Sequence, residues 1–325
     1  MAFSSDAEII MATDPSHFAL VARQLLRGKV TPFLGAGVNL SGRAQGGAWE
    51  RGRNLPSGGE LAAYLAESYA YPESDRDLLR VSQYVDVELG EGVLYEELRG
   101  LFAARYEPTV LHAILAAAVP MLRAAGAPQQ VLVTTNYDDL MEQALDAAGE
   151  AFDLLWYEAK RLDPNCGRFI HRAPDGTTTA IERPNEWAGI DLTARPAVLK
   201  LHGAVAAQPE GDSFVITEDN YIDYLALTDV ANQIPKVMQD PLRNSHFLFL
   251  GYSLRDWNLR VILSRIWGQQ KLTLNSWSVQ LGATPLDEKL WASRGQVDIV
   301  AEDVADYATA LKAALDACAG ALPAA

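Results

Sequence analysis

The sequence predicts an α/β protein with a doubly wound, mostly parallel sheet and an inserted helical module. First, short runs of apolar and β-branched residues alternate with segments of helical periodicity, as in parallel sheets covered by helices on both faces. Second, four of these runs end in glycine, small or polar residues instead of ordinary turns. In sheets of this type ligands bind beyond the carboxyl ends of the strands, so the same pattern predicts where a site lies.

Composition narrows the function classes. The chain has 325 residues, 49% of them hydrophobic, which is enough for one large core or for one domain with an insertion. Its net charge of −15, without a cluster of lysine and arginine, argues against direct binding to nucleic acid or to an anionic membrane. The two cysteines, Cys166 and Cys318, cannot supply a zinc site, so we expect no metal. So few cysteines, without a signal peptide or a membrane-spanning run, indicate a cytoplasmic protein.

The first strand and the loop after it carry the first candidate site. Helical spacing over residues 17–27 ends at Gly28, and residues 30–34 follow as a buried strand. Gly35 and Gly37 then turn the chain. Glycine at these positions allows left-handed backbone angles and lets a ligand approach the main chain closely, so we expect a nucleotide phosphate at the main-chain N–H groups. The loop over residues 41–56 has no periodicity, and its length is typical either of a functional lid or of a disordered segment.

Residues 57–127 form the predicted helical module. Ser57 and Glu60 have the spacing of a capping box, which marks the start of its first helix. Segments rich in alanine and leucine predict helices at 61–70, 75–88, 92–106 and 109–125. Because no strand pattern interrupts them, we expect the module to be inserted within a single domain that covers residues 1–325.

The rest of the chain supplies the remaining strands. We predict strands at 131–135, 152–157, 197–201, 214–216, 246–250, 277–281 and 297–300, and helices at 138–148, 217–225, 230–242, 256–267 and 303–320. Residues 159–195 are rich in proline, glycine, threonine and arginine, and we expect them to be irregular.

Four strand ends make up the predicted site. They are Gly35-Ala36-Gly37, Thr134-Thr-Asn136-Tyr-Asp138, His202-Gly203 and Gly251-Tyr-Ser253. A nucleotide fits such a site, but a dehydrogenase with the Rossmann fingerprint does not. The third glycine of that fingerprint is replaced by Leu40, and the acidic residue expected about 20 residues further on, here Glu60, lies in a helical pattern. The sequence therefore predicts a Rossmann-like nucleotide site without hydride transfer.

These four strand ends, in this order and over residues 30–300, resemble the sirtuin family, in particular its bacterial NAD-consuming branch. The resemblance implies a diphosphate site at Gly35, Ala36 and Gly37, with Asn136 near the nicotinamide ribose, Asp138 on the carboxamide and His202 as a base on the ribose. Thr134, Gly251, Ser253 and Asp256 belong to the same motifs, and Ser253 would bind phosphate or ribose. NAD+ is then the substrate.

The chemistry of these residue types agrees with the implied roles. Cleavage of the nicotinamide–ribose bond passes through an oxocarbenium-like state, by analogy with glycoside hydrolysis. It needs a base near neutrality, and a histidine in that role typically contributes ~10²–10⁴-fold to the rate. A desolvated, positively charged nicotinamide favours a nearby carboxylate.

Two departures from the family pattern shift the expected reaction. Classical deacetylating sirtuins carry a four-cysteine zinc module, which this chain cannot build, and the serine after the glycine turn is replaced by Asn39, with Ser41 two places on. We therefore expect an NAD+ glycohydrolase, which yields nicotinamide and ADP-ribose. Bacterial relatives of this kind resemble anti-phage defence effectors that deplete NAD+. The resemblance implies a homo-oligomer, with a HerA-like ring ATPase as a candidate partner.

Each candidate residue also has an ordinary structural explanation. A histidine after a strand is commonly a satisfied structural residue, and Asn136, Asp138 and Asp256 are of the types favoured as helix N-caps. Two other functions stay open, an NAD-dependent protein deacylase and a nucleotide-sensing module without turnover. The absent zinc ligands argue against the first, and His202 with Asn136 argues against the second. The products distinguish the three functions: a hydrolase yields free ADP-ribose, a deacylase yields O-acyl-ADP-ribose and a sensing module yields no product.

Overall fold

A computed structural model describes residues 14–41, 43, 47–227, 230–252, 260, 261, 263 and 274–320. Its centre is a nine-stranded sheet with the strand order β11-β10-β9-β1-β2-β6-β3-β4-β5. Seven strands pair in parallel, as predicted: β1 (Val30–Leu34), β2 (Val131–Thr134), β3 (Asp153–Tyr157), β6 (Ala197–Lys200), β9 (His246–Leu250), β10 (Ser276–Val279) and β11 (Val297–Val300). These strands are largely buried, which explains their continuous apolar runs.

The prediction of an irregular segment at 159–195 was wrong in part. This segment contains β4 (Phe169–Arg172) and β5 (Thr178–Ala180), which extend the sheet in antiparallel pairing beyond β3. Both strands are short, and β5 is mostly exposed, so neither produces a clear apolar run in the sequence. A second sheet consists of β7 (Gly203–Ala204) and β8 (Ser213–Phe214).

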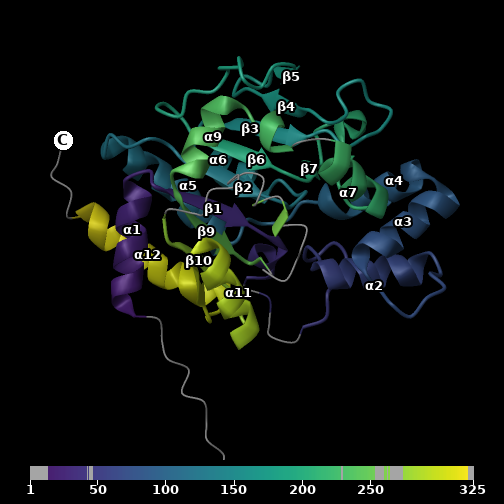
Figure 1. Ribbon diagram of the computed structural model, residues 1–325, viewed down its shortest axis with the longest axis horizontal. Coiled ribbons are helices and arrows are strands. Elements are labelled where there is room, and N and C mark those ends of the chain that lie inside the picture. The colour runs from purple at the N-terminus through teal and green to yellow at the C-terminus, as the bar shows by residue number, and fades with distance from the viewer. Residues whose placement is uncertain are drawn as a thin grey trace, which may run out of the picture.

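Helices cover both faces of the large sheet (Figure 1). One face is covered by α1 (Pro15–Leu26), α5 (Val110–Ala124), α6 (Leu140–Ala147) and α12 (Val304–Gly320). The other packs against α7 (Glu218–Ile222), η3 (Asp223–Leu227), α9 (Lys236–Arg243) and α11 (Pro285–Gly295). Three further helices are short: η1 (Ala36–Leu40), η2 (Pro209–Gly211) and α8 (Val230–Gln233). The doubly wound α/β architecture is thus confirmed.

One helix of the structure was not predicted, and one predicted helix lies mostly outside the described residues. The sequence analysis missed α11, although Thr284 and Asp287 form a capping box and Pro285 occupies the first turn, which is a recognisable start signal. The predicted helix at 256–267 lies mostly outside the described residues. Within the described part of the chain, no helix is both long enough and apolar enough to cross a membrane.

The helices between β1 and β2 pack in two groups. α2 (Gly58–Ser68), α3 (Leu78–Leu89) and α4 (Glu91–Phe102) share a core of their own, and Figure 1 shows them together beside the sheet. Ser57 caps α2 as predicted, accepting from the Glu60 N–H at 3.2 Å while the Glu60 carboxylate accepts from the Ser57 N–H at 2.8 Å. α5 instead packs against α6 and α12. The boundaries at 57 and 127 stay a prediction.

The direction of winding reverses at β1. Strands β2, β6 and β3 lie on one side of it, whereas β9, β10 and β11 lie on the other. In doubly wound sheets ligands bind in the crevice outside the carboxyl ends of the strands at such a switch point. Here this crevice lies between the ends of β1 and β9, where Gly35 and Gly251 follow the two strands.

Candidate functional site

Two main chains touch at the switch point, and this contact requires glycine. Gly35 donates its N–H to Leu250 O at 3.0 Å, and Gly37 donates to Gly251 O at 2.8 Å. A Cβ atom added to Gly37 would lie 2.6 Å from Gly251 O, and one added to Gly251 would lie 2.2 Å from Val38 N. Gly35 and Gly37 do not adopt the left-handed angles that glycine allows, whereas Gly251 has a positive φ of 64°. The phosphate-binding role of the turn stays a prediction.

The loop after β2 is tied to this turn. Thr134 donates its hydroxyl to Leu34 O at 3.0 Å and accepts from the Asn136 N–H, also at 3.0 Å. The Asn136 side-chain amide donates to Gly35 O at 3.2 Å. These bonds fix Asn136 against the glycine turn, so the simple capping explanation does not describe its side chain.

Asp138 has both a structural and a site-facing contact. One carboxylate oxygen accepts from the Leu140 N–H at 3.2 Å, at the start of α6, and the other accepts from the Asn39 side-chain amide at 2.7 Å. Only 5% of Asp138 is exposed. Burial raises the pKa of this carboxyl, while nearby Lys200 and the two hydrogen bonds act in the opposite direction. Asp138 therefore accepts from the first N–H of α6 and also contributes a desolvated carboxylate to the site.

A buried lysine, which the sequence analysis did not identify, donates hydrogen bonds to the loop after β2. Lys200 is fully buried at the end of β6, where its ammonium donates to Asp138 O and, at 2.6 Å, to the Glu142 carboxylate. Burial raises the pKa of Glu142, and the Lys200 charge opposes that rise. A charged residue inside the apolar run of residues 197–201 was the available signal.

His202 lies two residues beyond Lys200, with 4% of its surface exposed. Its Nδ1 atom is 3.3 Å from the Tyr221 hydroxyl, and its ring packs edge-to-face against Tyr224. Nε2 has almost no exposed surface and no hydrogen-bond partner among the described residues. Burial lowers the pKa of His202 to about 3, so in this structure the imidazole is neutral at physiological pH. Its pKa is thus far from the near-neutral value expected for a base.

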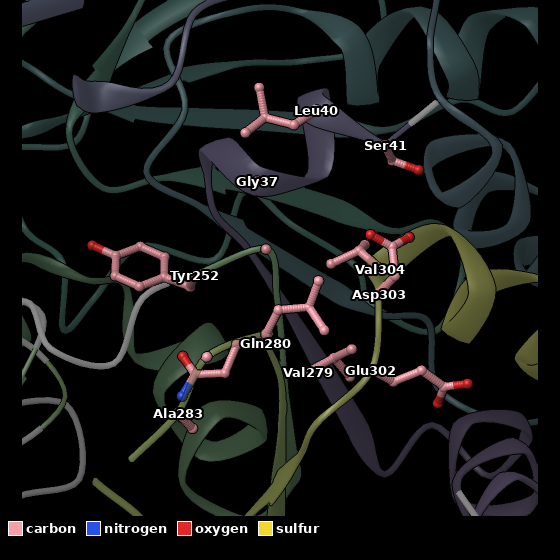
Figure 2. Close-up of a pocket in the computed structure, with 13 residues that line it drawn as sticks. Gly37, Leu40, Ser41, Tyr252, Val279, Gln280, Ala283, Glu302, Asp303 and Val304 are labelled. Carbon is pink, nitrogen blue, oxygen red and sulfur yellow. The ribbon is translucent and has the colours of Figure 1, made fainter. Parts of the chain in front are cut away.

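Two adjoining pockets open on the switch point. Pocket A, of about 370 Å³, is lined by residues of the predicted site, which include Gly37, Asn136, Asp138 and His202. Pocket B, of about 360 Å³, lies beyond the ends of β10 and β11 and is shown in Figure 2. Gly37, Gly251 and Tyr252 belong to the walls of both. One elongated ligand that crosses the glycine contact would occupy both pockets.

The structure brings together most of the predicted residues. Those lining pocket A are Ala36, Gly37, Asn136, Asp138, His202 and Gly251, while Gly35 and Thr134 support them through backbone and hydroxyl bonds. Ser253 and Asp256 lie outside the described residues. The sequence analysis assigned no role to Tyr252, and its place between the pockets could not be read from spacing. In the part of the chain that the structure describes, no three histidine, cysteine or acidic residues converge as metal ligands.

Comparison with known proteins gives a consistent picture. A family model described as a SIR2-like domain matches residues 130–297, which is just over half of the chain. The chain is 32% identical over 195 residues to "NAD(+) hydrolase ThsA" of Acinetobacter baumannii, covering 60% of this chain and 32% of that protein. It is 28% identical over 243 residues to a protein of the same name from Enterococcus faecium, covering 74% of this chain and 40% of that protein.

A third relative is "Defense-associated sirtuin 2" of Bacillus subtilis, 23% identical over 249 residues, or 75% of this chain and 20% of that protein. The chain thus aligns with between a fifth and two fifths of the length of these relatives. The family match, the four strand ends and the crevice at the switch point all agree. The chain belongs to the SIR2-like domain family.

Proposed function

We propose that this chain cleaves the nicotinamide–ribose bond of NAD+ and releases nicotinamide and ADP-ribose, as an NAD-depleting effector of bacterial anti-phage defence. The observation that carries the proposal is the convergence of Asn136, Asp138 and His202 in pocket A, beside the glycine contact. The names of the relatives, two NAD+ hydrolases and a defence-associated sirtuin, support the same activity.

The two adjoining pockets suit the two halves of a dinucleotide. The nicotinamide riboside half would occupy pocket A, where a buried carboxylate favours the positive ring. The diphosphate would cross the turn at Gly37, and the adenosine half would occupy pocket B, beyond β10 and β11. In this order the scissile bond would lie beside Asn136 and His202.

The reaction consumes one water molecule. The C1′–N bond breaks with its electron pair going to the nicotinamide nitrogen, which neutralises the ring and makes it a good leaving group. The water oxygen bonds to C1′, and its proton is released to a base. A neutral His202 can accept a proton from a ribose hydroxyl or from this water, and the Asn136 amide can orient either group. In the structure His202 Nε2 has almost no exposed surface, so we expect NAD+ binding to move the neighbouring tyrosines.

The homo-oligomer and the HerA-like ring ATPase belong to the proposal and rest on the family resemblance. The defence role itself would be tested in cells, where phage infection should lower NAD+ only if the chain is intact. Light scattering of the purified chain, alone and with a candidate ATPase, tests the assembly.

The decisive experiment is NAD+ turnover by the purified protein, with products separated by chromatography. We expect nicotinamide and ADP-ribose in equal amounts without any acyl-lysine peptide. His202→Ala and Asn136→Ala should be inactive, whereas His246→Ala, at the amino end of β9, should retain activity. Formation of O-acyl-ADP-ribose only with an acylated peptide would favour a deacylase. Binding of NAD+ without any product would favour a sensing module.

A further inference from the structure

We propose that pocket B selects NAD+ over NADP+, and that Asp303 is the residue that determines this selectivity. The inference rests on the proposed function, because it takes pocket B as the adenosine end of the dinucleotide site. The two dinucleotides differ only at the 2′ position of the adenosine ribose, where NADP+ carries a phosphate. Their discrimination therefore depends on the charges in pocket B.

Asp303 is held at the carboxyl edge of the sheet by its own helix. It follows β11 and precedes α12, where one carboxylate oxygen accepts from the Ala305 N–H at 2.8 Å and its carbonyl accepts from the Tyr307 N–H at 2.9 Å. The other carboxylate oxygen has no hydrogen-bond partner among the described residues. Figure 2 shows the Asp303 carboxylate on the side of the pocket that faces Ser41, whereas the Glu302 carboxylate points away. A fixed acceptor thus faces the pocket.

The described residues that line pocket B include two acids, Glu302 and Asp303, and no lysine or arginine. Arg43, which lies just beyond Ser41, is already committed, since its guanidinium forms a two-bonded ion pair with Glu60 at 2.8 and 3.0 Å. The described wall therefore offers carboxylate and amide acceptors to ribose hydroxyls. It offers no side-chain cation that would neutralise a 2′-phosphate.

Two opposing fields act at this position, and their magnitudes decide the outcome. The N-terminus of a helix carries the equivalent of about half a positive charge, which alone would attract a phosphate. The full negative charge of Asp303 sits on the same helix end and outweighs it. A phosphate monoester carries about −1.5 to −2 charges at pH 7, so a carboxylate within a few ångströms should weaken its binding by roughly 100-fold or more.

The position of Asp303 also bears on the acidic residue of the Rossmann fingerprint, which this sequence lacks at the usual spacing. In dinucleotide sites of the Rossmann type an acidic residue about 20 residues after the glycine turn binds the ribose 2′-hydroxyl. The acidic residue nearest to that spacing is Glu60, which accepts from the Ser57 N–H in the capping box of α2 and pairs with Arg43. Asp303 supplies the same chemistry from a strand on the other side of the switch point.

The test is binding of ADP-ribose and of 2′-phospho-ADP-ribose by calorimetry, which requires no turnover. We expect the natural chain to bind ADP-ribose at least 100-fold more tightly. Asp303→Asn keeps a residue that can cap α12 but removes the charge, and should reduce the ratio to about tenfold or less, mainly by improving binding of the phosphorylated ligand. Asp306→Asn, in the first turn of the same helix but outside the pocket lining, is the matched control and should leave the ratio unchanged.

Equal affinities in the natural chain would overturn the inference, as would an unchanged ratio in Asp303→Asn while its melting temperature stays normal. An equal change in Asp306→Asn would reduce the effect to the general field of the helix end and would also overturn it. If neither ligand binds, the nucleotide site itself is wrong, and this inference fails with it. If both bind with the expected ratio but NAD+ is not cleaved, the selectivity stands and the proposed reaction fails.

Discussion

Two clusters of buried charge lie at opposite ends of the sheet. At the amino end of β3, the carboxylate of Asp153 is fully buried and accepts from Arg195 at 2.7 and 3.2 Å and from His171 at 2.8 Å. At the carboxyl end of β6, the ammonium of Lys200 contacts the Asp138 carbonyl and the Glu142 carboxylate. The cations differ in burial, since the Arg195 side chain is 28% exposed and the Lys200 side chain 1%, and the hydrogen bonding of the two clusters also differs.

The first cluster is satisfied and the second is not. Both oxygens of Asp153 have partners, whereas Glu142 Oε2, Asn39 Oδ1 and His202 Nε2 have none among the described residues. Buried polar atoms in folded proteins are nearly always hydrogen-bonded, so the unpartnered Asn39 Oδ1 and His202 Nε2, whose residues line pocket A at this edge, need an explanation. A polar ligand at that edge is the simplest one. The difference supports the proposal that pocket A, next to the carboxyl-end cluster, binds a ligand.

The largest expected effect separates two buried histidines. His202→Ala should lower the rate of NAD+ cleavage by ~10²–10⁴-fold, the usual contribution of a base, with a small change in melting temperature. His171→Ala should leave turnover per folded molecule within about twofold and lower the melting temperature instead. Steady-state kinetics beside calorimetric melting curves would show both. Comparable losses of activity in the two variants would remove the functional distinction between the clusters.

The next largest effect is the loss of stability when the cation of each cluster, Lys200 or Arg195, is removed. Lys200→Met leaves Glu142 buried without its charge partner and should lower the free energy of unfolding by ~3–5 kcal/mol. Arg195→Met should lower it by less, about 1–2 kcal/mol, because the Arg195 side chain is 28% exposed and His171 still donates to Asp153. Denaturant titration gives both values.

A double substitution sharpens this prediction. Lys200→Met with Glu142→Leu removes both charges and should restore stability to within about 1 kcal/mol of the natural chain. Activity should remain low, because the Asp138 carbonyl loses its anchor. Full recovery of activity together with stability would show that the pair has no role beyond folding.

The pH dependence of stability follows from buried histidines. The folded-state pKa values of His202, about 3, and His112, about 4, lie below the ordinary value of 6.5, so only the unfolded chain takes up these protons in weak acid. Each group therefore contributes stability that is complete above pH 6.5 and lost as the pH falls towards its folded pKa, by roughly 1.4 kcal/mol per pH unit. His202→Gln should reduce the loss between pH 6.5 and 5, to which His112 and His17 also contribute because burial lowers their pKa values. An unaltered slope would mean that His202 is not buried in solution.

The smallest expected effect tests the bond from Asn39 to Asp138. Asn39→Ala removes a 2.7 Å hydrogen bond to the buried carboxylate and should lower kcat/KM for NAD+ by about tenfold. Asn244→Ala removes an exposed amide that donates to Asp240 O, and serves as the control. A selective rise in KM would assign Asn39 to binding, and a selective fall in kcat would assign it to the reaction itself.

Much of the sheet could be predicted because buried parallel strands appear in a sequence as continuous apolar runs. The strands at 30–34 and 246–250 were predicted with the observed bounds, since each is a continuous apolar run bounded by glycine or polar residues. The short antiparallel strands β4 and β5 were missed because their burial depends on the neighbouring strand β3 rather than on a pattern of their own.

The residues of the site could be predicted from the sequence, but the hydrogen bonds between them could not. Asn136, Asp138 and His202 end adjacent parallel strands, so their convergence follows from the fold. The contact of Asn39 with Asp138 joins residues 99 positions apart, and no spacing rule predicts it. Gly35 and Gly37 are needed for contact with the turn after β9, which the sequence does not reveal, and not for left-handed angles.

The strand order has a consequence for biosynthesis. Strand β1 is translated first but lies between β2 and β9, and its turn is completed by Gly251. Contacts over such long sequence separations form late, and a nascent chain emerges from its amino end. Ribosome-bound intermediates that stop before residue 246 therefore lack one wall of the crevice. If the proposed NAD+ cleavage takes place in this crevice, the unfinished polypeptide cannot carry it out before β9 and Gly251 have been synthesised.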